Sequence, residues 1–125
     1  MIKCLCKNNY LWRWKMEYLE LIFLFIVAHV FGDYVFQGEY IATTKSKNYY
    51  HLFVHCIIYT FCFWCVFFYL NKISFALLML IFASHFIIDL AKGILNTKKP
   101  SNSKLYYAID QLLHYAVILL VIFVV

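Results

Sequence analysis

Charged residues are scarce in this chain. They make up 14% of the 125 residues, against about 25% in soluble domains, while 66% are hydrophobic and the mean hydropathy is +0.78. So few charges cannot cover the surface of a water-soluble globule. The composition therefore predicts an integral membrane protein that lies in a lipid bilayer as one domain, without a soluble module.

Polar, glycine-rich loops are also missing between the five cysteines. A small secreted scaffold would place such loops between its disulfides, so a disulfide framework is not expected. The spacing Cys62-x-x-Cys65 occurs in redox and metal sites, but here it lies within IIYTFCFWCVFFYL. We expect thiols in such an apolar stretch to pack as small hydrophobic groups rather than to react.

A basic face of a soluble surface is missing as well. The formal net charge is +5, but Lys and Arg fall between apolar runs, as in membrane proteins, so nucleic-acid binding is not expected. Residues 1–16 form a short basic arm that lacks a signal-peptide cleavage pattern. Met16 is a second candidate start just before the first apolar run, and residues 17–125 are expected to form the transmembrane domain.

Four apolar segments are present, at about residues 18–36, 52–70, 73–95 and 105–125. Each is close to the ~20 residues that a helix needs to cross a ~30 Å hydrocarbon core. The runs are continuous rather than alternating, which favours helices over a transmembrane barrel. Asn71 and Lys72 form a very short turn, and 38–50 and 96–104 are polar connectors. The sequence thus predicts an all-α membrane protein with four transmembrane helices in an antiparallel bundle.

Aspartate occurs three times, and each copy has a histidine four residues away. Residues four apart are neighbours on one face of a helix. Two pairs lie near the C-terminal ends of the first and third segments, and one lies near the N-terminal end of the fourth. An antiparallel bundle brings all three to one membrane face, where the second segment adds His51 and His55. We therefore expect one site built from four helices and the pairs His29/Asp33, His85/Asp89 and Asp110/His114.

Ionisable groups at membrane depth are costly, and they are normally paired or bound to a ligand. Histidine and carboxylate together form the ligand set of Zn, Mn or Fe, and harder metals such as Mg are favoured as the carboxylate share rises. We expect a divalent metal bound by His29, Asp33, His85, Asp89, Asp110 and His114. Three neighbouring side chains are expected to support these ligands: Gln37, Lys92 and Gln111.

A site with two metal ions would suit hydrolysis of a phosphate ester or pyrophosphate. At the interface it can reach the headgroup of a lipid-linked substrate. In this interpretation Asp33, Asp89, Asp110 and His55 are the catalytic groups, with a free carboxylate or His55 as the general base. Gly32, between the members of the first pair, is expected to let a neighbouring helix approach closely.

Two other interpretations remain open at this point. The pairs can satisfy one another as a structural network in a small interaction protein, or they can form an ion or proton site of a transport protein. The polar residues are confined to one end of the four segments. This confinement counts against a conduction path through a single chain, although a homo-oligomer could build one elsewhere.

Several stretches together resemble a known family. AHVFGDYVFQ at 28–37, HFIIDLAKG at 85–93 and YAIDQLLH at 107–114, with His55 between them, are similar to an uncharacterised bacterial membrane family called domain of unknown function 3307. The resemblance spans about residues 19–121 and implies the fold and the site, but no reaction. The residues that match are His29, Gly32, Asp33, Gln37, His55, His85, Asp89, Lys92, Asp110, Gln111 and His114.

The basic residues predict an orientation only if the chain starts at Met16. Six Lys lie on the side of the site, and five Lys and Arg lie on the other side when the arm is counted. Without the arm, the other side keeps only Lys72. The positive-inside rule then places the site at the cytoplasmic face of the bacterial cytoplasmic membrane.

Overall fold

The computed structural model describes residues 17–125, and the predicted basic arm at 1–16 lies outside them. Within the described residues the chain forms helices and turns, without strands. Four helices are long and apolar enough to cross a membrane, namely Glu17–Val35, Tyr49–Tyr69 (α3), Phe75–Lys98 (α4) and Pro100–Val124. The predicted all-α fold with four candidate membrane spans is therefore confirmed.

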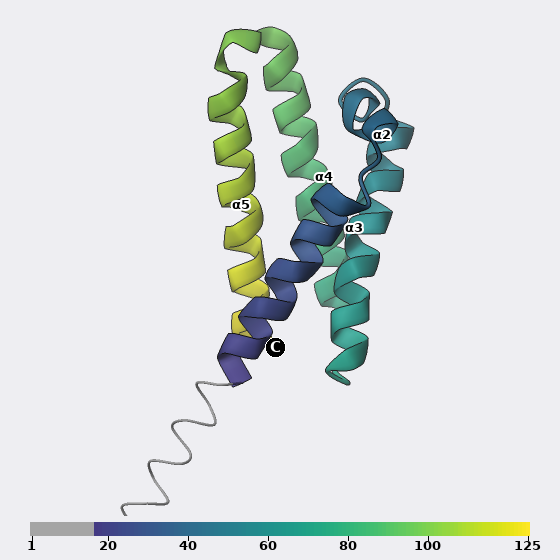
Figure 1. Ribbon diagram of the computed structural model, residues 1–125, viewed down its shortest axis with the longest axis vertical. Helices are drawn as coiled ribbons and strands as arrows, with labels where there is room; N and C mark the ends of the chain where they lie inside the picture. The colour runs from purple at the N-terminus through teal and green to yellow at the C-terminus, as the bar shows by residue number, and fades with distance from the viewer. Residues whose placement is uncertain (1–16) are drawn as a thin grey trace, which may run out of the picture.

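The four helices pack as an antiparallel bundle (Figure 1). α4 packs against both α3 and α5 (Ser103–Val124), and the end of the first span packs against α3. Asn71 reverses the chain between α3 and α4 with a φ of 52°, a left-handed conformation that asparagine tolerates. At the opposite end the 3₁₀ turn η2 (Pro100–Asn102) joins α4 to α5. The hairpin predicted around residues 71 and 72 is present.

The helix ends differ from the predicted segments. The polar connector at 38–50 contains a short helix, α2 (Glu39–Thr44), and α3 begins at Tyr49 rather than near residue 52. Asn48 caps α3, since its side chain accepts a hydrogen bond from the backbone N–H of Tyr50 at 2.9 Å. Hydropathy locates only the part of a helix that lies in lipid, so polar turns that extend beyond it are missed.

The first span ends as a π-helix, η1 (Phe31–Val35). The N–H of Phe36 donates to the carbonyl of Phe31 at 2.8 Å, five residues back instead of four. Single π turns within α-helices occur frequently at functional sites. This turn carries Gly32 and Asp33, and both are buried.

The half of the bundle near the Asn71 turn has an apolar core. Phe25 of the first span contacts Phe63 and Phe67 of α3, with ring centroids 5.6 Å apart in both pairs. Ile81 of α4 and Val121 of α5 complete this core. The buried polar residues lie beyond it, toward the end of the bundle that carries α2 and η2. The fold therefore separates a packed apolar half from a polar half.

At Gly32 the first span and α3 approach each other closely. A Cβ atom at this position would lie 2.9 Å from both Cα and Cδ2 of Tyr59. The expected close helix approach is confirmed. Because the contact includes backbone, Gly32→Ala is expected to destabilise the protein by about 1–3 kcal/mol. Thermal unfolding in detergent micelles measures this change.

Gly38→Ala is the matched control for this prediction. Nothing lies within 4 Å of a Cβ atom at Gly38, so this variant is expected to unfold at the wild-type temperature. Equal unfolding temperatures for the two variants would contradict the close contact at Gly32.

Candidate metal centre

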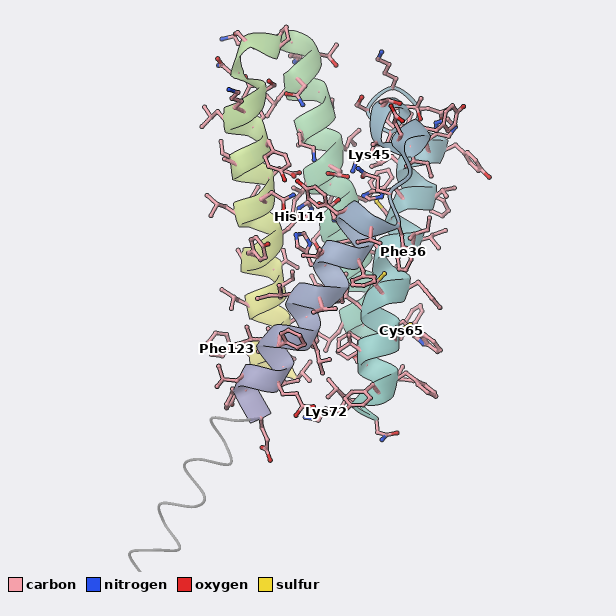
Figure 2. All side chains as sticks on the ribbon, viewed as in Figure 1. Phe36, Lys45, Cys65, Lys72, His114 and Phe123 are labelled. Atoms are coloured by element: carbon pink, nitrogen blue, oxygen red, sulfur yellow. The ribbon has the colours of Figure 1, made fainter. Side chains whose placement is uncertain are left out.

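The three His–Asp pairs and His55 meet in one buried cluster. Every one of these side chains has a residue exposure of 6% or less. Figure 2 shows Lys45 near the α2 end of the bundle, Lys72 at the opposite end and His114 between them. The spacing of four residues puts each pair on the inner face of its helix, and the antiparallel arrangement brings the faces together. The members of the cluster are His29, Asp33, His55, His85, Asp89, Asp110 and His114.

Four of these residues form a first group that can hold a metal ion: Asp33, His55, His85 and Asp89. Nε2 of His55 lies 3.0 Å from Nε2 of His85, 3.3 Å from Oδ1 of Asp33 and 3.4 Å from Oδ2 of Asp89. Nε2 of His85 lies 4.0 and 3.8 Å from the same two oxygens. Bonds of 2.0–2.1 Å around a tetrahedral zinc ion place its ligand atoms about 3.3–3.4 Å apart. The two separations from His55 to the carboxylate oxygens match this value, and the two from His85 are 0.4–0.7 Å longer.

Lys45 completes this group from outside the four membrane spans. Its Nζ donates to Oδ2 of Asp89 at 2.6 Å and to Nε2 of His55 at 3.0 Å, and it lies 3.7 Å from Oδ1 of Asp33. An ammonium group can only donate, so Nε2 of His55 accepts, as both carboxylate oxygens do. Three acceptor atoms therefore surround the Lys45 ammonium, which satisfies them as a cation.

A second group consists of Asp33, Asp110 and His114. Asp33 belongs to both groups. Oδ1 of Asp110 and both ring nitrogens of His114 are buried without a hydrogen-bond partner within residues 17–125. Unsatisfied buried polar atoms are costly and rare, so these three atoms are free to bind a ligand.

Lys92 links the two groups. Its Nζ donates to Oδ1 of Asp89 at 2.8 Å and to Oδ2 of Asp110 at 2.9 Å. With neutral histidines, the three aspartates and the two lysines leave the cluster with one net negative charge. Each carboxylate therefore has a lysine nearby. The three carboxylates still carry one more negative charge than the two lysines neutralise.

His29 lies beside the groups and in neither of them, as far as the described residues go. Oε1 of Gln111 can only accept, so Nε2 of His29 donates to it at 3.1 Å. Nδ1 of His29 then accepts from the hydroxyl of Tyr59 at 3.0 Å. The Gln111 amide donates to Asp33 at 3.0 Å and to Asp110 at 3.1 Å. His29 thus orients Gln111, which in turn holds the two carboxylates of the second group.

The other predicted residues are placed as follows. Lys92 and Gln111 contact the carboxylates directly, and the supporting role expected for them stays a prediction. Gln37 is half-buried, and its Oε1 has no partner among residues 17–125. His51 lies apart from the cluster, where its Nδ1 pairs with the hydroxyl of Thr44 at 2.7 Å.

Sequence reasoning missed two residues of the site. Tyr59 stacks on His85 with ring centroids 3.6 Å apart, besides its bond to His29. Its spacing of four residues from His55 was a usable signal, because it continues the inner face of α3. Lys45 carried no such signal, since its position depends on how the connector folds back over α4.

A groove reaches the cluster from the side of the bundle. It lies between α4 and α5, has a volume of about 70 Å³, and includes Lys92 and Asp110 in its lining. The rest of its wall is mainly apolar, with Ile88, Ala91 and Leu113 among the lining residues. The second group therefore has a hollow beside it, on the α4–α5 side of the bundle.

The resemblance noted above is supported by a family model. No curated protein and no solved structure matches the chain. The model, described as "Protein of unknown function (DUF3307)", matches residues 21–125, which include every residue of the cluster. The chain therefore belongs to the DUF3307 family of proteins of unknown function.

Proposed function

We propose that the cluster is a two-ion divalent metal centre that hydrolyses a phosphate ester or pyrophosphate of a lipid-linked substrate at one membrane face. The observation that carries this proposal is that Asp33 belongs to two metal-compatible groups. A shared carboxylate holds two ions close together, and ions about 3.5–4 Å apart stabilise both the attacking and the leaving oxygen in phosphoryl transfer.

The two groups differ in how many ligands they offer. The first offers four protein ligands, which fill a tetrahedral ion and are typical of a structural role. The second offers three, which leaves a position for water or substrate, as in catalytic sites. We therefore assign substrate binding to the second ion, held by Asp33, Asp110 and His114.

The groove between α4 and α5 favours a lipid-linked substrate. Its apolar residues suit a hydrocarbon chain, and its polar residues, Lys92 and Asp110, lie at the second group. A lipid can enter such a groove from the bilayer and bring its phosphate to the ion without leaving the membrane. Lys92 would then donate hydrogen bonds to the phosphate oxygens.

The apolar half of the bundle favours this proposal over transport. Phe25, Phe67, Leu78, Val121 and Ile122 are buried together between the cluster and the other end of the bundle. A conduction path needs polar groups through the whole membrane thickness. The polar half alone is sufficient for chemistry at one face.

Metal analysis of the protein purified in detergent tests the centre itself. We expect two equivalents of Zn, Mn or Fe in the wild type and one in Asp89→Asn, because this variant damages only the first group. Glu39→Gln, which alters an exposed carboxylate on α2, is the control and is expected to keep both ions. A wild-type protein without bound metal would refute the proposal.

The reaction is tested separately with lipid phosphate monoesters, phosphodiesters and pyrophosphates in mixed micelles. Release of phosphate by the metal-loaded wild type, at least about 100-fold faster than by Asp110→Asn, is the expected result, since loss of one catalytic electrostatic contact costs 10²–10³ in rate. If metal-loaded protein releases no phosphate from any of them, the centre is not a phosphohydrolase.

A further inference from the structure

We propose that Lys45 is a built-in cation that occupies the first metal position and has to leave before a metal ion binds there. Metal occupancy and the position of the connector at 36–50 are then coupled. The inference rests on the proposed metal centre and adds a form of regulation to it.

The geometry places Lys45 at the metal position. Its Nζ lies within 3.7 Å of three of the four ligand atoms of the first group, and the shortest distance, to Asp89, is 2.6 Å. A metal ion bonded to the same atoms at about 2.0–2.2 Å would lie too close to the ammonium for both cations to remain. Because the two cations share the same acceptors, their binding is mutually exclusive.

The connector that carries Lys45 buries few side chains. Within residues 36–50, all of them described, Lys45 is the one buried residue, and α2 itself buries no side chain. The other contacts of the segment are made by half-buried or exposed side chains. Ser46 rests against Gly93 of α4, Thr44 and Tyr40 contact His51, and Phe36 packs on Phe31. A segment with so few buried contacts opens at low cost, so its closed position depends on the ion pairs of Lys45.

Charge balance gives a reason for the exchange. With Lys45 and Lys92 in place, the cluster has one net negative charge. While the second metal position is empty, one divalent ion in place of Lys45 makes the cluster neutral, which is the least costly state for charges at membrane depth. Lys45 is released toward the connector, on the side away from the apolar core.

Zinc affinity measured in detergent micelles, by competition with a chromophoric chelator, tests the exchange. Lys45→Met keeps the length of the side chain and removes its charge. We expect this variant to bind Zn²⁺ at least about 10-fold more tightly than the wild type, because the competing charge of the same sign is gone. Lys47→Met, two residues away on the exposed side of the connector, is expected to match the wild type.

Amine labelling of the wild type gives a second measurement that needs no variant. Saturating Zn²⁺ is expected to raise the labelling rate of Lys45 at least about 10-fold, as a buried amine becomes exposed. The labelling rate of Lys47 is expected to stay constant. If Lys45→Met does not fold, this measurement alone decides whether Zn²⁺ displaces Lys45.

The outcomes separate the two proposals. If wild type and folded Lys45→Met bind Zn²⁺ equally, or if the variant binds it more weakly, the exchange is wrong while the metal centre stands. Unchanged labelling of Lys45 under saturating Zn²⁺ also overturns the exchange. If neither protein binds Zn²⁺ or another divalent ion, the metal centre fails and the exchange fails with it.

Discussion

Asp33→Asn is expected to purify without bound metal, while Asp110→Asn keeps one equivalent. Asp33 is the one residue common to both groups, so its replacement removes a ligand from each ion. Loss of a residue that only supports a ligand costs 10–100-fold in metal affinity, so loss of the shared ligand is expected to exceed about 100-fold. Elemental analysis measures the bound metal, and zinc competition in detergent measures the metal affinity.

Asp110→Asn is a closely matched comparison for Asp33→Asn. Asp33 and Asp110 are both buried carboxylates, and both accept hydrogen bonds from Gln111. If the two Asn variants lose the same amount of metal, Asp33 does not bridge, and the cluster holds a single ion. Retention of both ions by Asp33→Asn would show that Asp33 is a ligand of neither ion.

Lys92→Met is expected to produce the largest loss of stability in metal-free protein. The substitution removes the ammonium that now bridges Asp89 and Asp110 at 2.8 and 2.9 Å. Asp89 keeps its ion pair with Lys45, but Asp110 loses its lysine partner. Removal of one partner from a buried ion pair costs about 3–5 kcal/mol, because the remaining charge is buried without compensation. Thermal unfolding in detergent with a chelator present measures the loss.

Added Zn²⁺ is expected to restore most of this stability, because an ion that binds only the folded state stabilises it. Lys99→Met, at the exposed end of α4, is the matched control and is expected to unfold like the wild type. An unfolding temperature of Lys92→Met equal to that of Lys99→Met would contradict the bridging role. A loss that Zn²⁺ leaves unchanged would argue that the two carboxylates do not bind the ion.

The fold and the convergence of the site were predictable from local patterns. Four apolar runs defined the spans, and the turn at Asn71 and Lys72 determined that α3 and α4 are antiparallel. Because the three His–Asp pairs repeat a spacing of four residues, their placement at one end of the bundle followed from helix geometry alone.

The finer arrangement of the site depends on tertiary contacts. His29 and Asp33 share one helix face, yet His29 turns to Tyr59 and Gln111 while Asp33 enters both groups. The π turn at Phe31–Val35, which carries Asp33, has no signature in residue type. Lys45 reaches the cluster because its connector packs on Gly93, a contact between residues far apart in the sequence.

The ion pairs of the cluster also bear on how the chain is made. Asp89 has Lys92 one helical turn away, and Asp110 meets the same lysine across the α4–α5 hairpin. Asp33 meets Lys45 twelve residues later, before α3 begins. As the spans leave the ribosome in order, each aspartate finds a counter-charge in its own or the adjacent segment. The chain can therefore enter the bilayer hairpin by hairpin, without waiting for distant spans to neutralise its carboxylates.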